Sequence, residues 1–531
     1  MLTEFSGERT LRSGLFVSVA LALVIGPVLA LAASPHASPP PAAADAAAPV
    51  MHDSFAPPDA VTQHTMLLNG QTLAYTARAG TIELRNDKDQ PTCSMFYTAF
   101  TLDGADPSTR PVTFVYNGGP GSATLWLRMG SFGPKRVALV NGAPTGPPPY
   151  QLVDNQYTLL DKTDLVFIDM PGSGFSRING KGTPKDFFGA DQDVLAFDQF
   201  ISRYISTFDR WNSPKVIFGE SYGTPRSAML AKRLQQDGIY VNGVVLLSSI
   251  LNYGLYADAY PPVESLGDDW AYPLYLPTEA ATAWYHHRLP NPPGSLDQLL
   301  PQVERFAQGD YLNALEQGAR LSPSARDRIV STLHQYTGIS EAYIRASNLR
   351  VPYERFMTEL MRGSDQMIGR YDGRYLDYML DGNSETGRQD PTDSAIDGAF
   401  ISGNNQLIRN FMGYDTTMQY RSTIYPTIRA AGGWDMKHLG QTPLNTAPDL
   451  AEAMVANSQM KVFSANGYYD FATPFFNTMY VLNHLNLNPQ LQSNISYGFY
   501  PSGHMVYLNV DALALFHNDL ENWYATLPRM H

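Results

Sequence analysis

The feature of this sequence that restricts its fold most is a series of short, mostly apolar runs separated by longer helical or glycine-rich stretches. The main runs are Val112–Tyr116, Asp164–Ile168, Lys215–Phe218, Gly243–Leu247, Lys461–Ser464 and Ile495–Phe499. Segments that are apolar throughout suit strands buried on both faces of a parallel sheet. Helical segments between such strands cover the two faces of the sheet. We therefore predict an α/β fold with a mostly parallel central sheet flanked by helices.

The sequence pattern changes in residues 251–440, where helical stretches such as Leu299–Gln308 and Pro323–Tyr336 replace the strand-like runs. We expect 61–250 and 441–531 to form the α/β core, with 251–440 inserted between two late strands as a largely helical cap. Ligands of open α/β sheets bind outside the carboxyl ends of the strands. The cap is therefore expected to cover that edge.

The N-terminal region is typical of an exported protein. Residues 1–32 contain two arginines, then an apolar run, then the small residues of Ala30-Leu31-Ala32, which is the order of a secretory signal peptide. The alternative is a retained membrane anchor, because the run is almost long enough to span a bilayer. Residues 33–60 are rich in Ala and Pro and are predicted to be a disordered tether. Cleavage of 1–32 would leave no stable membrane association.

Net charge and cysteine content restrict the function further. The formal net charge of −13 argues against a nucleic-acid partner, because nucleic-acid phosphates require a basic surface. Cys93 is the single cysteine of the 531 residues, so no intrachain disulfide is possible. Its neighbours resemble a strand, and we interpret it as a packed small side chain rather than a nucleophile. An exported protein without disulfides favours the bacterial periplasm or exterior.

The stretch Gly219-Glu220-Ser221-Tyr222-Gly223 has the G-x-S-x-G pattern of a nucleophile elbow. The apolar run Val216–Phe218 precedes it, and the helix-forming segment Ser227–Leu234 follows. Pro225 suits a first helical turn, where its missing N–H would have no partner anyway. Strand, turn and helix in this order identify Ser221 as the predicted nucleophile.

A serine on such an elbow needs a histidine base and an orienting carboxylate, in the chain order Ser, Asp or Glu, His. His504 follows the last predicted strand, and Asp470 follows the strand before it. Asp449 and Asp511 are alternatives for the acid, but neither follows a strand. The pair at 286–287 lacks a third neighbouring ligand, so no metal site is predicted there.

A second glycine-rich loop, Asn117-Gly118-Gly119-Pro120-Gly121-Ser122, follows the run Val112–Tyr116. An N–H group of this loop and that of Tyr222 would form an oxyanion hole. The alternative, a phosphate-binding loop, is disfavoured because the Lys-Ser/Thr of a P-loop and the spacing of a dinucleotide fingerprint are both missing. No cofactor is predicted.

At this level of detail the chain resembles the serine carboxypeptidases, a family of α/β-hydrolases, in what looks like a bacterial-type member. The matching motifs are the Asn117–Ser122 loop, Gly133-Pro134, Asn155-Gln156-Tyr157, Asp169-Met170-Pro171-Gly172-Ser173-Gly174-Phe175-Ser176, Gly219–Tyr222, Asp470 and Gly503-His504-Met505. The resemblance implies a secreted serine hydrolase that cleaves peptides from a free C-terminus. It also implies that Asn117, Gly118 and Glu220 bind the terminal carboxylate, while Gly119 and Tyr222 form the oxyanion hole.

Several residues depart from the family pattern. Gly223-Thr224 replaces the usual Ala-Gly after the elbow tyrosine, and Ser131 stands where a second glutamate is common. Three other functions therefore stay open: a prolyl- or tripeptidyl-type aminopeptidase, an esterase or acyltransferase on the same scaffold, and a non-catalytic binding protein. The predicted partner is a peptide substrate, and the sequence does not indicate an oligomeric state.

Overall fold

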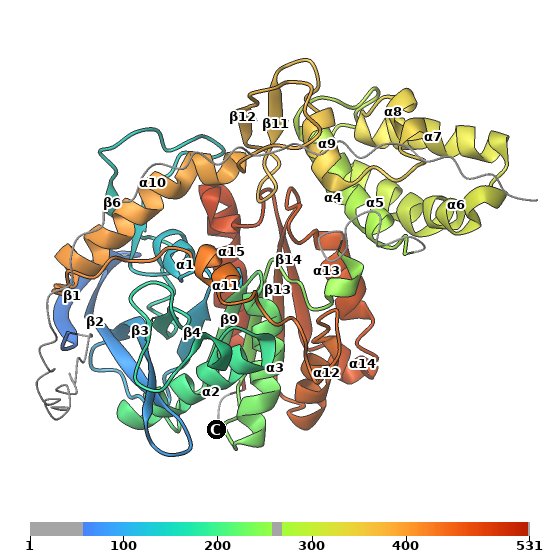
Figure 1. Ribbon diagram of the computed structural model, residues 1–531. Helices are drawn as coiled ribbons and strands as arrows, with labels where there is room; N and C mark the ends of the chain where they lie inside the picture. The colour runs from blue at the N-terminus through green and yellow to red at the C-terminus, as the bar shows by residue number, and fades with distance from the viewer. Residues whose placement is uncertain (1–56, 257–267, 529–531) are drawn as a thin grey trace, which may run out of the picture. The chain divides into compact units, whose positions relative to one another are not determined.

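The computed structural model describes residues 57–256 and 268–528 (Figure 1). Its strands are β1 Ala60–Leu68, β2 Gln71–Arg85, β3 Pro91–Leu102, β4 Val112–Tyr116, β5 Lys135–Val137, β6 Leu152–Asp154, β7 Asp164–Ile168, β8 Arg177–Ile178, β9 Lys215–Glu220, β10 Gly243–Leu247, β11 Gln366–Ile368, β12 Leu376–Tyr378, β13 Lys461–Gly467 and β14 Ile495–Tyr500. All six of the apolar runs identified above are strands. The predicted strand positions are therefore confirmed.

One large sheet runs in the order β1-β2-β3-β7-β4-β9-β10-β13-β14, with β8 paired to β3. The pairs from β7 to β14 along this order are parallel, whereas β1, β2 and β3 pair antiparallel. Parallel strands place their carboxyl ends at the same edge of the sheet, so the segments that follow β4, β9, β10, β13 and β14 all leave from that edge. This mostly parallel sheet confirms the predicted fold class.

The helices are α1 Leu125–Gly130, α2 Ala190–Thr207, α3 Gly223–Gln236, α4 Ala271–Tyr285, α5 Leu296–Phe306, α6 Leu312–Gln317, α7 Pro323–Thr337, α8 Glu341–Ala346, α9 Tyr353–Glu359, α10 Pro391–Asn405, α11 Tyr425–Ala430, α12 Ala447–Ala456, α13 Phe475–Asn483, α14 Pro489–Gln492 and α15 Val510–Ala525. Two π-helical segments, Ala307–Tyr311 and Gln406–Phe411, extend α5 and α10.

Two apolar cores cover the two faces of the sheet. Side chains from α1, α10 and α15 pack against one face, and side chains from α2, α3, α12 and α13 pack against the other. Within β10, Val245 and Leu247 belong to the first core, while Val244 and Leu246 belong to the second. Successive side chains of a strand point to opposite faces, so an apolar run is what a strand buried on both sides requires.

The segment between β10 and β13 has two structurally different parts. Helices α4 to α9 surround an apolar cluster of their own, which also includes Phe471 and Phe475 from the segment after β13. Helix α10 instead packs on α1 and contributes Ala399 and Phe400 to a core of the sheet (Figure 1). The predicted insertion 251–440 thus supplies both a separate helical layer and part of the core itself.

At the N-terminal end of the described chain, β1 and β2 form an antiparallel hairpin. The turn residues Asn69 and Gly70 both have positive φ, at 49° and 78°, as a tight two-residue hairpin turn requires. Strand β1 begins at Ala60, and Asp59 already pairs with Arg78 at 3.3 Å. The last residues of the predicted tether 33–60 therefore belong to the sheet, because β-pairing begins there. The predicted signal segment 1–32 lies outside the described residues.

Cys93 is fully buried in β3, and burial raises the pKa of its thiol. This is the environment of a packing residue. Within the described ranges, no helix has the length and apolar character needed to cross a membrane.

Candidate active site

Ser221 lies on a tight turn between β9 and α3, where its backbone φ is +59°. A serine rarely adopts this left-handed conformation, and such strain is concentrated at functional sites. Thr224 supports the turn, because its hydroxyl donates to the Ser221 carbonyl at 2.7 Å and accepts from the Ile250 N–H at 2.9 Å. Thr224 departs from the usual family residue, yet its hydroxyl fits this turn.

His504 and Asp470 lie together at the carboxyl edge of the sheet. The Nδ1 of His504 is 2.9 Å from Asp470 Oδ2, and both side chains are almost fully buried. Asp470 also accepts the N–H groups of Ala472 and Thr473, at 2.8 and 2.9 Å, and the Thr473 hydroxyl at 2.6 Å. The carboxylate therefore fixes the proton on Nδ1 and leaves Nε2 as the basic nitrogen of the imidazole.

The electrostatics of this pair favour a charged carboxylate beside the imidazole. Burial by itself would raise the pKa of Asp470, but His504 and Thr473 outweigh it and lower that pKa. Burial likewise would lower the pKa of His504, but Asp470, and then Glu220, raise it above its usual value. An imidazole that is easily protonated beside a fixed carboxylate is suited to accept a proton from a nucleophile.

Glu220, the last residue of β9, is 3% exposed. Its Oε1 accepts a hydrogen bond of 2.8 Å from the side-chain amide of Asn117, while Oε2 has no hydrogen-bond partner among the described residues. Burial raises the pKa of Glu220 to about 7, although His504 and the neighbouring Tyr507 hydroxyl act in the opposite direction. A buried carboxyl of this kind is neutral more easily than an exposed one, and its second oxygen has no hydrogen bond among the described residues.

The Asn117 loop is held from two directions. The Asn117 side-chain oxygen accepts the Leu127 N–H of α1 at 3.0 Å, and the Asn117 carbonyl accepts a bond of 2.8 Å from Arg226 of α3. Arg226 is itself fully buried against Asp193, at 2.6 Å. These contacts fix the side chain of Asn117 beside Glu220.

Gly118 of the glycine-rich loop lies directly against the nucleophile turn. A Cβ atom at Gly118 would overlap the Tyr222 nitrogen and come within 2.6 Å of the Gly223 nitrogen. Gly119 has a φ of +109°, a region that favours glycine. The N–H groups at the start of α3 have no acceptor within the helix. The backbone of Gly118 therefore packs directly on the start of α3, beside Ser221.

These groups line one cavity of about 410 Å³. Its wall includes Ser221, His504, Glu220 and residues 117–120 of the glycine loop. Six of the eight predicted site residues line this cavity, namely Asn117, Gly118, Gly119, Glu220, Ser221 and His504. Tyr222 and Asp470 are not in its wall, and Asp470 is fully buried in contact with His504. Sequence reasoning also missed several wall residues, namely Trp126, Tyr253, Arg370, Tyr371, Asp393, Asp397, Thr423 and Tyr425.

The segment 370–374 of the predicted insertion holds the histidine loop in place. The His504 N–H donates to the Tyr371 carbonyl at 2.6 Å, and the Gly503 N–H donates to Asp372 Oδ2 at 3.1 Å. Arg374 pairs with Asp372 at 2.5 Å and donates to the Pro501 carbonyl at 3.0 Å. No motif in the sequence indicated the contacts with the histidine loop, because they join residues more than 120 positions apart.

The alternative site residues have other partners. Asp449 lies on α12, where its carboxylate oxygens are 2.9 Å from Lys232 Nζ and 3.0 Å from His438 Nε2. Asp511, near the start of α15, accepts a hydrogen bond of 2.8 Å from the side-chain amide of Asn141. Ser131 is buried at the end of α1, where its hydroxyl donates to the Leu127 carbonyl at 2.6 Å. Ser131 is not among the residues of the cavity wall, so it adds no carboxylate-binding group there.

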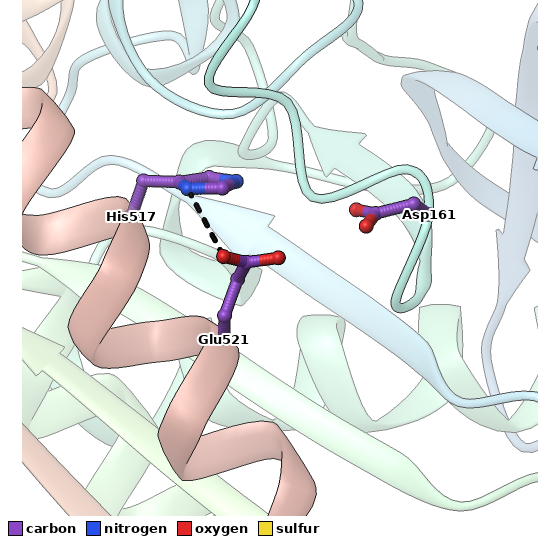
Figure 2. A group of neighbouring side chains, drawn as sticks. All are labelled: Asp161, His517 and Glu521. Atoms are coloured by element: carbon purple, nitrogen blue, oxygen red, sulfur yellow. Dashed lines mark ion pairs between the residues drawn. The ribbon is translucent and has the colours of Figure 1, made fainter. Parts of the chain in front are cut away.

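A separate cluster of Asp161, His517 and Glu521 has the composition of a metal site (Figure 2). His517 and Glu521 project from α15, with an ion pair of 3.7 Å between them. The ammonium of Lys162 lies 2.9 Å from both Asp161 and Glu521 and already neutralises these carboxylates. We therefore interpret the cluster as an ion-pair network that stabilises the fold.

The Asp169–Ser176 motif is structural in this chain. Asp169 is fully buried and pairs with Arg128 of α1 at 3.0 Å, and it accepts the Tyr420 hydroxyl at 2.9 Å. Arg128 also donates to Asn404 of α10 at 2.8 Å. This network joins the end of β7, α1 and the segment between β10 and β13.

Part of the chain matches a known protein family. Residues 70–253 match the family model described as serine carboxypeptidase. The matched region contains the Asn117 loop, Glu220 and Ser221. This match shows that residues 70–253 are similar to the serine carboxypeptidase family. The family resemblance inferred from the sequence motifs is confirmed.

The chain is also similar to a curated protein and to a solved structure. Serine carboxypeptidase-like 33 of Arabidopsis thaliana is 30% identical over 150 residues, which are 28% of this chain and 30% of the relative's length. The solved structure of Kex1(delta)p, a prohormone-processing carboxypeptidase from Saccharomyces cerevisiae, matches with a TM-score of 0.52 at 15% identity, over 85% of this chain and 91% of that one. The structural likeness establishes the α/β-hydrolase fold shared with that family member.

Proposed function

We propose that the protein is an exported serine-type carboxypeptidase, which hydrolyses peptides from a free C-terminus through an acyl-enzyme on Ser221. The observation that carries the proposal is Glu220, a buried carboxyl group that adjoins the nucleophile, lines the cavity and has one oxygen without a hydrogen bond among the described residues. Neither a general esterase nor a binding protein requires such a group there. A carboxyl group that keeps its proton, in contrast, donates a hydrogen bond to a substrate carboxylate.

The chemical steps follow from the positions of the groups. The Ser221 oxygen attacks the carbonyl of the last peptide bond, and His504 accepts the serine proton on Nε2. The N–H groups of Gly119 and Tyr222 stabilise the negative oxygen of the tetrahedral intermediate. His504 then protonates the leaving amine, and the C-terminal amino acid departs. Water attacks the acyl-enzyme, gives a proton to His504 and restores Ser221. Asp470 keeps the imidazole oriented throughout.

Glu220, Asn117 and Gly118 would hold the substrate C-terminus during these steps. Two facing carboxylates repel each other unless they share a proton, which raises the apparent pKa of the pair. Activity on free-acid peptides should therefore fall as the pH rises through the pKa of Glu220, about 7 in the free protein. On the acid side, activity should fall as His504 becomes protonated.

The test is the pH dependence of kcat/KM for wild type and Glu220→Gln on one free-acid peptide and its C-terminal amide. The glutamine cannot ionise, so the alkaline limb on the free acid should flatten in the variant while the acid limb stays. The amide should be hydrolysed more slowly by wild type and respond less to the substitution. Equal wild-type efficiency on both peptides at every pH would exclude a carboxypeptidase and leave an aminopeptidase, an endopeptidase or an esterase.

Export is the second part of the proposal. It is supported by the order of charged, apolar and small residues in 1–32. Mass spectrometry of the protein expressed in a bacterial host with its own N-terminus should find a mature chain that begins after Ala32. An intact Met1 in the secreted or periplasmic fraction would contradict cleavage.

A further inference from the structure

Two carboxylates from α10 face the same cavity as the nucleophile. Asp393 and Asp397 both line the 410 Å³ cavity together with Ser221 and His504. They are four positions apart on one helix, so their side chains lie on the same face. Neither residue belongs to any motif of the catalytic core, and neither takes part in the proposed steps of hydrolysis.

The environment of these carboxylates indicates a missing positive partner. Asp397 Oδ1 is buried without a hydrogen-bond partner among the described residues. Burial raises the pKa of Asp393 to about 7, with further increases from Asp390 and Asp397, against the lowering effects of Arg370 and His504. Burial and then Asp390 raise the pKa of Asp397 to about 6.

The charges of the cavity wall also favour a positively charged ligand. Its described wall contains three carboxyl groups, those of Glu220, Asp393 and Asp397, against the single guanidinium of Arg370 and the imidazole of His504. Glu220 is also buried and has an unpaired oxygen, so two separate positions in the wall have an unpaired carboxyl oxygen. A substrate carboxylate entering this cavity would meet net repulsion unless the same substrate carries a positive charge.

We propose that Asp393 and Asp397 recognise a cationic side chain, a guanidinium or an ammonium, on a residue that flanks the scissile bond of the substrate. This inference rests on the proposed carboxypeptidase function and specifies its substrate class. A guanidinium presents several N–H donors in a fixed fork and binds carboxylates through charge-assisted hydrogen bonds. A metal ion fits less well: within the described ranges, the one group of three candidate ligands within 4.8 Å of one another is the Asp161 cluster.

The experiment uses N-acylated peptides with a free C-terminus, so that a basic side chain is the sole cation. One pair has Arg or citrulline as the last residue, and a second pair has Arg or citrulline as the penultimate residue. Citrulline keeps the shape of Arg but has no charge. A charged hydrogen-bonded contact contributes roughly 1.5–3 kcal/mol, so wild type should prefer Arg by about 10- to 150-fold in kcat/KM in one of the two pairs.

The variants Asp393→Asn and Asp397→Asn should each move this Arg/citrulline ratio toward one. Asp415→Asn is the matched control, because Asp415 is an exposed carboxylate outside the cavity wall, and it should keep the wild-type ratio. The ratio should also increase between pH 5.5 and pH 8, as the carboxylates of Asp393 and Asp397 ionise. A test without variants is inhibition of the wild type by L-arginine, which should be stronger than inhibition by L-citrulline.

The outcomes separate this inference from the function on which it rests. Arg/citrulline ratios near one in both wild-type pairs would overturn the cationic site while leaving the carboxypeptidase intact. An unchanged preference in both aspartate variants would overturn it too. If peptides were cleaved only when their N-terminal amine is free, the α10 carboxylates would bind that amine, and the inference would be wrong. If no free-acid peptide were cleaved at all, both the proposed function and this inference would fail.

Discussion

The α/β core and the segment between β10 and β13 contribute differently to the cavity. The core supplies Ser221, Asp470 and His504 from turns at the carboxyl edge of the sheet, and each follows an apolar strand. The segment between β10 and β13 supplies the side chains of Asp393 and Asp397 to the cavity wall. It also supplies the hydrogen-bond partners that hold the loop of His504 in place. We infer that the core determines the reaction, whereas the inserted segment determines alignment and substrate choice.

The largest expected effect comes from the core. Ser221→Ala and His504→Ala should each lower kcat by about 10⁴-fold or more, because covalent catalysis is lost. Asp470→Asn should have a smaller effect than either. The measurement is kcat on a free-acid peptide, with the melting temperature as the control for folding. Near-normal turnover by Ser221→Ala would refute its assignment as the nucleophile.

The strands and catalytic residues of the core could be predicted because each is specified by a short stretch of sequence. Each strand is a short apolar run, and the elbow, the acid and the base follow strands at positions that the chain order fixes. The inserted segment was predictable only as helical. Its contacts depend on pairings such as Asp372 with Gly503, which no periodicity or short motif encodes. The π-helical end of α10 and the packing of α10 on α1 could not be predicted from the sequence either, because an apolar helix face does not specify the element on which it packs.

A smaller effect in the core is expected from Gly118→Ala. The added Cβ would overlap the Tyr222 nitrogen, which is backbone and has little freedom to move. Displacing one oxyanion donor reduces kcat by about 10²- to 10³-fold in other serine hydrolases, and we expect a loss of that order. The control is Gly309→Ala, where the new Cβ meets no atom within 4 Å. Full activity of Gly118→Ala would mean that this loop does not form the oxyanion hole.

In the inserted segment, Arg374→Ala should lower activity and stability together. It leaves the buried Asp372 without its partner, which destabilises by about 3–5 kcal/mol in comparable cases, and it frees the loop that holds His504. Small misplacements of catalytic groups cost up to about 10²-fold, so we expect kcat to fall about 10- to 100-fold with little change in KM. The measurements are urea unfolding and steady-state kinetics.

The matched control for this variant is Arg355→Ala in the same segment. Arg355 forms an exposed pair with Glu385 at 3.0 Å, and such pairs contribute about 0–1 kcal/mol. If Arg374→Ala behaved like Arg355→Ala in both assays, the inserted segment would not align the histidine loop.

The smallest effect concerns Glu279, which is buried in α4 and has its pKa raised to about 8 by burial. The folded state keeps a proton that the unfolded state releases near its ordinary pKa of 4.5. Stability should therefore fall as the pH rises from about 4.5 to 8. Glu279→Gln should reduce that fall by a few degrees of melting temperature, whereas the exposed Glu316→Gln should not. Identical pH slopes in wild type and Glu279→Gln would show that Glu279 does not titrate in this range.

The most direct measurement of the proposed function is a time course of products from one long peptide with both ends free, followed by mass spectrometry. A carboxypeptidase on this scaffold should release single residues from the C-terminus and produce a ladder that shortens from that end alone, and Ser221→Ala should produce none. A ladder from the N-terminus, or internal fragments as the first products, would contradict the assignment of Glu220 and Asn117 to the substrate C-terminus.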